Sequence, residues 1–283
     1  MVKIISDSTS DLTRKLIDKY DISVIPLHIL LGDDEYRDGV DITPDKIYEW
    51  ADENKTTPKT SAVSIEDAIN VFKSVLEAGS DIVAFAISED MSTTANVFRL
   101  AAKELEAEER IHVIDSENLS TGIGHLVIEA AVMAQKGMSA SEIEKNILDL
   151  RPRVRASFVV DTLTYLHRGG RCSGLAAMAG GVLKLHPRIE VNNGKMNPGK
   201  KYRGRMKNVV LDYVKDMEED LKMAKKDRVF ITHSGCDKEI VEDVKNYLKQ
   251  LEVFDAIYET RAGGVISSHC GPGTLGVLFI AGE

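Results

Sequence analysis

The sequence predicts an α/β fold of two domains, with a parallel, doubly wound-like sheet in the N-terminal domain and a mixed sheet in the C-terminal domain. At 283 residues, the chain is long for one hydrophobic core. Up to about residue 150, short β-branched runs alternate with helical patterns, as is typical of a parallel sheet. Later, Asn193-Gly194 separates two strand-like runs and signals a hairpin. We place the boundary in DLRPR and expect domains at 1–153 and 154–283.

The first domain is expected to open with a strand, a loop and a helix capped near Ser10 or Asp11. Runs that end in polar turns predict strands at 23–32, 81–88 and 110–116, the first one irregular because it contains Pro26. Helical periodicity, with N-terminal caps such as Thr43 and Ser64, predicts helices at 43–54, 64–79, 93–108, 125–137 and 139–153.

The second domain is expected to begin with a strand and a short helix over 156–171. Its remaining elements are a helix of small residues at 173–185, a hairpin at 187–204, a long helix at about 206–226, a strand at 228–233, a helix at 237–251 and strands at 254–261 and 276–281. The stretch Ser267–Gly276 is expected to be a polar turn, held rigidly because an apolar strand follows it.

Composition narrows the class of protein. Apolar residues make up 43% and charged residues 29% of the chain, as in a soluble globular protein. No apolar run reaches the ~20 residues of a membrane span, and the three cysteines are scattered, which favours a reduced cytoplasmic location. No phosphate-binding loop, no GxGxxG turn after a strand, no GxSxG elbow and no histidine pattern for a metal is present.

Positive charge is concentrated in residues 151–207, which hold 13 Lys and Arg against two acidic residues, although the whole chain carries −9. Two interpretations stay open. The segment could be a solvated basic face, or a docking surface for an acidic protein or a phosphate-bearing partner. The acidic overall balance and the lack of a recognition motif argue against nucleic acid.

Polar side chains follow four predicted strands, where open α/β sheets bind ligands. They are Asp7-Ser8-Thr9, Ser88 with the residues after it, Asp115-Ser116 and His233-Ser234. Caps and turns are the favoured interpretation for the two Asp-Ser pairs.

Residues at three further positions in the sequence could contact an anion. Thr60-Ser61 precede a capped helix and could hold a carboxylate, or could only satisfy the backbone of a turn. His269 beside a glycine turn could be functional or structural. Gly169 and Gly170 permit close backbone approach, so that Arg171 could brace a loop or face an anion.

Several motifs, taken in order, resemble the DegV family over essentially the whole chain: KIISDSTSDL, PKTSAVS, ISEDMSTTAN, VIDSENLSTGIG, LTYLHRGGR and HCGPGTLGV. The resemblance implies two α/β domains with a fatty acid buried between them. It implies that Thr60, Ser92 and His269 bind the carboxylate, with Ser61, Thr93 and Arg171 as secondary contacts. Two departures from the family pattern affect the head group, because Ala62-Val63 replace Gln-Pro and Thr93 replaces a glycine.

The resemblance further implies a carrier that is not itself an enzyme, uses no cofactor or metal, and presents its long-chain fatty acid to a partner fatty-acid kinase. The segment 151–207 would be the docking surface. Candidate walls of an acyl tunnel are 125–134 and 173–183, which ordinary helix packing explains equally well. The alternatives are a hydrolase of small acyl or phosphoryl substrates, with Ser92 as nucleophile and His269 as base, and an interaction module without an enclosed apolar pocket.

Overall fold

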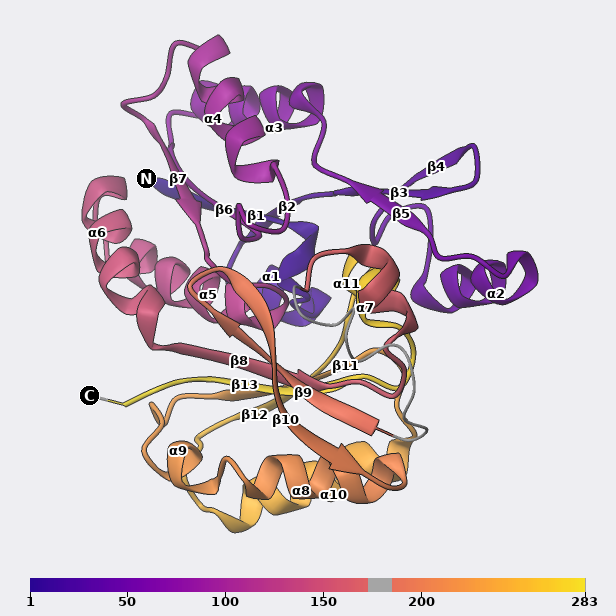
Figure 1. Cartoon of the computed structure of the whole chain (residues 1–283). Helices are drawn as coiled ribbons and strands as arrows, with labels where there is room; N and C mark the ends of the chain where they lie inside the picture. The colour runs from indigo at the N-terminus through magenta and orange to yellow at the C-terminus, as the bar shows by residue number, and fades with distance from the viewer. Residues whose placement is uncertain (173–184, 283) are drawn as a thin grey trace.

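The computed structural model describes residues 1–172 and 185–282, in which sheets and helices are stacked in layers (Figure 1). One layer is a parallel sheet with the strand order β2-β1-β6-β7. Its strands are β1 (Val2–Asp7), β2 (Ser23–Ile25), β6 (Asp81–Ala86) and β7 (Ile111–Asp115). Because all four run the same way, their carboxyl ends meet at one edge, where ligands bind in open α/β sheets.

Helices cover both faces of the parallel sheet, as the doubly wound pattern predicts. One face carries α3 (Ile65–Glu77) and α4 (Thr94–Glu104), and the other carries α5 (Thr121–Gln135) and α6 (Ala140–Leu150). The predicted cap of α3 is confirmed, since the Ser64 hydroxyl accepts a hydrogen bond from the Asp67 amide at 3.0 Å.

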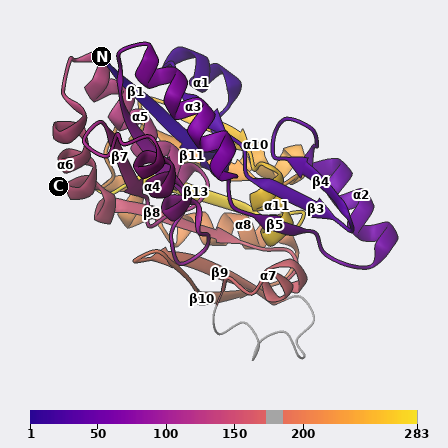
Figure 2. The ribbon, with the colours of Figure 1, turned by 90° about the horizontal axis from the view of Figure 1, so that it is seen from above.

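A small antiparallel sheet, with the order β4-β3-β5, projects from this layer together with helix α2 (Figures 1 and 2). Its elements are β3 (His28–Leu31), β4 (Asp34–Arg37), α2 (Pro44–Asn54) and β5 (Lys59–Ser61). The single irregular strand predicted for residues 23–32 is in fact two strands in different sheets. Pro26 lies at the break, since proline cannot donate to a strand ladder.

The remaining strands form a mixed six-stranded sheet in the order β10-β9-β8-β13-β11-β12. These are β8 (Val154–Val159), β9 (Leu185–Asn192), β10 (Lys195–Arg203), β11 (Val229–His233), β12 (Ile257–Arg261) and β13 (Leu275–Ile280). Helices α8 (Met206–Lys215) and α10 (Lys238–Gln250) cover one face, with α9 (Glu218–Lys222) nearby in Figure 1. The predicted hairpin is confirmed, and both its turn residues, Asn193 and Gly194, have positive φ.

Helix α5 lies between the parallel sheet and the six-stranded sheet and contacts strands of both (Figure 1). All its residues from Thr121 to Ala131 are buried, which explains its nearly continuous apolar sequence. The remaining short elements are η1 (Ser8–Ser10), α1 (Arg14–Lys19), η2 (Arg151–Arg153), α7 (Thr164–Gly169) and α11 (Gly264–Cys270). The strands of the six-stranded sheet begin at Val154, so we propose that the domains divide at the predicted place, near residue 153.

Three predictions about local structure are wrong. Helix α1 is capped by Thr13 rather than by Ser10 or Asp11, because the Asp11 side chain makes tertiary contacts instead. The long helix predicted for 206–226 is two helices, α8 and α9. Residues 264–270 form helix α11 rather than a turn. The small-residue helix predicted for 173–185 falls, except for its last residue, outside the described residues.

Candidate ligand-binding site

A cavity of about 500 Å³ brings all six predicted contact residues together, and apolar residues make up much of its lining, which also includes Glu89 and Asp90. The predicted residues are Thr60, Ser61, Ser92, Thr93, Arg171 and His269. The apolar residues that line it are Leu27, Ile87, Met91, Leu119, Met196, Val265 and Ile266. A pocket of this kind does not favour the alternative of a pure interaction module. The candidate wall at 125–134 is wrong, since no residue of α5 lines this cavity.

Thr60 and His269 form a polar pair at one side of the cavity. The Thr60 Oγ1 lies 2.8 Å from His269 Nε2, although 209 positions separate the two residues in the chain. Burial, together with the positive charge of Arg171, lowers the pKa of His269 to about 4. The imidazole is therefore neutral at pH 7, and its Nε2 can donate a hydrogen bond when that nitrogen carries the proton.

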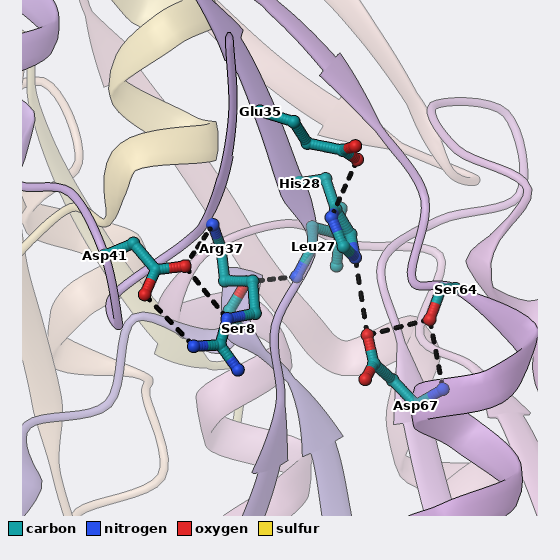
Figure 3. A network of polar contacts seen from close by, with 8 residues as sticks. All are labelled: Ser8, Leu27, His28, Glu35, Arg37, Asp41, Ser64 and Asp67. Atoms are coloured by element: carbon teal, nitrogen blue, oxygen red, sulfur yellow. Dashed lines mark hydrogen bonds and ion pairs between the residues drawn. The ribbon is translucent and has the colours of Figure 1, made fainter.

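The strand that carries Thr60, β5, pairs with β3, and β3 in turn is tied to α3. Thr60 pairs with Ile29 of β3, and next to it His28 contacts Glu35 at 2.9 Å and Asp67 at 3.4 Å (Figure 3). Asp67 also pairs with Ser64 in the first turn of α3. This network connects the small sheet to α3 and fixes the strand that presents Thr60 to the cavity.

Gly169, at the end of α7, packs directly against the His269 ring. A Cβ atom at this position would lie 2.4 Å from His269 Nδ1, so no side chain fits there without moving the imidazole. The predicted close approach of the backbone is therefore present at Gly169, and the positive φ is present at Gly170. Arg171 donates to the Gly169 carbonyl at 2.7 Å, so it braces this loop, and it also lines the cavity.

The Ser92 hydroxyl lies at the start of α4. It accepts a hydrogen bond from the Thr94 amide at 3.3 Å and lies 3.0 Å from the Thr94 hydroxyl. Ser92 and Thr93 therefore line the cavity at the N-terminal end of a helix, where the helix dipole favours a negatively charged ligand group.

This geometry does not favour the hydrolase alternative. In a nucleophile–base pair, Ser92 would contact His269, but His269 Nε2 pairs with Thr60 instead. His269 Nδ1 is buried and has no hydrogen-bond partner among the described residues, so no carboxylate orients the ring.

Most of the other polar segments that follow strands form turns, as their sequence spacing indicates. Asp7 accepts from the Thr9 amide at 3.0 Å, and Asp115 accepts from the Glu117 amide at the same distance. Among residues 1–172 and 185–282, no group of His, Cys, Asp and Glu has the arrangement of a metal site. No helix of the described chain combines the length and apolarity needed to cross a bilayer.

The apolar residues that line the cavity could not be identified from the sequence. Met91, Leu119, Met196 and Ile266 line the cavity but come from four separate segments. None belongs to a pattern that distinguishes a cavity wall from ordinary core. Only the tertiary arrangement brings them together.

Comparisons with known proteins agree with the fold and the pocket. A family model described as an uncharacterised protein of the DegV family matches residues 1–282. A DegV domain-containing protein from Caldanaerobacter subterraneus is 33% identical over 280 residues, which cover 98% of each chain.

Solved structures of fatty-acid-binding proteins are similar to this one. A DegV family protein from Thermus thermophilus, described by its fatty acid binding, has a TM-score of 0.91 and 30% identity and covers 99% of both chains. A stearic acid-binding protein from Eubacterium ventriosum has a TM-score of 0.87 and 31% identity, over 99% of this chain and 98% of that one.

Proposed function

Because the chain belongs to the DegV family, we propose that it binds a long-chain fatty acid in the cavity between its two main sheets. The observation that carries this proposal is the cavity itself, in which many lining residues are apolar and the neutral Thr60 and His269 side chains form a polar pair. The structural relatives that are described as binding fatty acids support it.

We assign the carboxylate to Thr60, Ser92 and His269, with Ser61, Thr93 and Arg171 as secondary contacts. Hydrogen bonds from neutral donors to a charged acceptor contribute roughly 1.5–3 kcal/mol each. Thr60 and His269 already lie within hydrogen-bond distance of each other, so one ligand oxygen could contact both. Arg171 would add a positive charge at the rim.

The acyl chain would supply most of the affinity. Each CH₂ group that leaves water contributes about 0.8 kcal/mol. A second, apolar cavity of about 20 Å³ shares Leu119, Ile266 and Cys270 with the main one. It indicates the direction in which the inner end of the chain would run, toward Phe158 and Leu278 of the six-stranded sheet.

Mass spectrometry of an organic extract of the purified protein tests this function. We expect about one fatty acid per chain, because a buried acyl chain dissociates slowly from an apolar cavity. A denatured sample washed free of lipid and refolded is the control, and it should take up stearate on incubation. No lipid in the extract and no uptake of stearate would contradict the proposal.

We further propose that the protein is a carrier without catalytic activity that presents the carboxylate to a partner fatty-acid kinase. Much of the positive charge in 151–207 is already paired within the chain, for example Lys195 with Asp90, Lys200 with Asp216 and Lys207 with Glu239. Lys201, Arg203 and Arg205 are exposed and form no ion pair with a described residue. Arg155 and Arg168 are exposed as well. Lys201, Arg203 and Arg205 lie together at and just beyond the end of β10, the strand that also contributes Met196 to the cavity, and we place the proposed docking surface there.

Charge reversal tests this surface. In the double variant Arg203→Glu/Arg205→Glu we expect acyl-phosphate formation by the kinase to fall on the order of tenfold, because electrostatic steering of the partner is lost. Fatty acid content should not change. The matched control is Lys238→Glu/Lys249→Glu on α10, where both side chains are exposed. Unchanged kinase turnover in the β10 variant would exclude this docking surface.

A further inference from the structure

Helix α11 carries His269 near its C-terminal end, and two buried carboxylates from the start of the chain hold its N-terminal end. The Gly263 amide donates to Asp11 Oδ1 at 2.8 Å, and the Gly264 amide donates to Asp38 Oδ1 at 2.7 Å. These contacts span 252 and 226 positions of the chain. Since Thr60 contacts His269, residues from the first 61 positions contact both ends of this short helix.

The second oxygen of each carboxylate is also fixed. Asp11 Oδ2 lies 2.5 Å from the Ser120 hydroxyl, and Asp38 Oδ2 accepts from the Ser8 hydroxyl at 2.8 Å. The fit at the helix is tight, because a Cβ on Gly264 would lie 2.9 Å from Asp38 Oδ1 and 2.6 Å from Ile29 Cδ1. Lateral movement of the helix start would therefore break hydrogen bonds or produce clashes.

Burying these carboxylates close together is electrostatically unfavourable. Asp7, Asp11 and Asp38 are all buried and repel one another, and no Lys or Arg among the described residues forms an ion pair with any of them. Burial raises the pKa of all three, to about 6 for Asp7 and about 8 for Asp11. A serine or asparagine would cap a helix without this cost. Costly buried carboxylates of this kind are concentrated near functional sites.

We propose that Asp11 and Asp38 are positioning residues, which hold α11 against the N-terminal part of the chain and thereby set the place of the His269 imidazole opposite Thr60. The role in ligand binding rests on the function proposed above. The effect on His269 does not, since it concerns the ligand-free protein.

Protons can reach these carboxylates from solvent, because both line a second, open groove. The charged and titratable groups around Asp11 are Asp7 on β1, Asp38 after β4, Cys270 on α11 and, around the groove, Lys3, Arg14, Asp18, Asp21 and Arg261. Asp11 Oδ2 accepts from the Ser120 hydroxyl and Oδ1 accepts from the Gly263 amide, and burial still raises the pKa of this carboxyl to about 8. The pKa of Asp11 is higher in the folded than in the unfolded chain. The contribution of Asp11 to the free energy of unfolding is therefore present at low pH and is lost as the pH rises through about 8.

Nitrogen NMR of the histidine rings in the ligand-free protein tests the proposal, with His269→Gln to assign the signals. In Asp38→Ala we expect the His269 nitrogen shifts to change, because the Gly264 amide loses its acceptor. Asp38→Asn should restore most of the wild-type shifts, since its amide oxygen can still accept. Gly169→Ala is the positive control, because its methyl group must displace the ring.

The pH dependence of the same signals separates positioning from a general structural effect. The His269 ring does not itself titrate above pH 6, yet its shifts should show an inflection near pH 8 in the wild type. Asp11→Asn should remove this inflection. Asp7→Asn is the matched control, because Asp7 is also buried but contacts Thr9 and Ile87 rather than α11. It should keep the inflection, moved to a lower pH because one repelling carboxylate is gone.

Stearate binding is measured on the same variants, and Asp38→Ala should weaken it at least about tenfold, as expected when one hydrogen bond to a charged group is lost. Unchanged His269 shifts in the folded variants Asp38→Ala and Asp11→Asn would overturn the proposal. Equal changes in Asp7→Asn would also overturn it. If the wild type bound no fatty acid but the shifts changed as described, the proposed function would fail and the positioning role would stand.

Discussion

Replacing Glu129 with leucine is expected to lower the free energy of unfolding by about 3 kcal/mol, the lower end of the range for breaking a buried ion pair. Glu129 on α5 is buried, and its Oε1 accepts from Arg228 at 2.8 Å and from Lys225 at 2.7 Å. Without it, two cations face each other, and among the described residues the buried Arg228 keeps one ion-pair partner, Asp227 at 3.7 Å. That remaining partner is the reason for choosing the lower end of the range.

Chemical denaturation measures this effect, provided that the denaturant slope stays constant. The double variant Glu129→Leu/Arg228→Met should recover part of the loss, because no unpaired buried charge remains. Arg14→Met is the surface control. Its pair with Asp18 is exposed, so its loss should cost less than about 1 kcal/mol. A loss in Glu129→Leu as small as that of the control would contradict the prediction.

The Glu129 pair is one of three polar contacts along a single face of α5. Thr121, His125 and Glu129 are spaced four residues apart, and each contacts the six-stranded sheet or the segment that leads into it. Burial lowers the pKa of His125 to about 3, so its neutral ring can donate from Nε2 to the Leu278 carbonyl at 3.0 Å. This face fixes the helix against the six-stranded sheet, while its remaining surface packs against the parallel sheet.

The sequence predicted helix α5 but not this contact face. An apolar run identifies a buried helix, whereas the partners of Thr121, His125 and Glu129 lie about 100 residues or more away. For the same reason, helix α11 was predicted as a turn. Gly263, Gly264 and two serines favour irregular structure locally, and the contacts that stabilise the helix come from Asp11 and Asp38.

For the candidate site, in contrast to α5 and α11, the sequence did predict which distant residues come together. Short motifs identified Thr60, Ser92 and His269, and the structure places all three around one cavity. The family resemblance implied that Thr60 and His269 both contact the ligand carboxylate, but the direct contact between them was not predicted. A close approach of the backbone at Gly169 was predicted from its residue type, because glycine permits it, but the sequence did not indicate that the His269 imidazole is the partner.

In the double variant Thr60→Val/Ser92→Ala we expect stearate affinity to fall by about 100- to 10,000-fold. Each hydrogen bond to a charged acceptor contributes roughly 1.5–3 kcal/mol, and two are removed. Thr60→Val keeps the volume of the side chain, so the strand pairing with Ile29 and the packing of β5 should persist. The expected loss therefore concerns the carboxylate and not the fold.

Isothermal titration with stearate, together with the organic extract of each variant, measures this loss. Thr43→Val is the matched control, because its hydroxyl makes no capping hydrogen bond and it does not line the cavity. Binding of an alkane or a fatty alcohol of equal length measures the contribution of the acyl chain without that of the carboxylate. Its weaker binding should be nearly the same in the wild type and the double variant, because it has no carboxylate to lose. If the double variant bound stearate as tightly as the wild type, the carboxylate would have to lie elsewhere, and the assignment of Thr60 and Ser92 would be wrong even though the cavity still bound lipid.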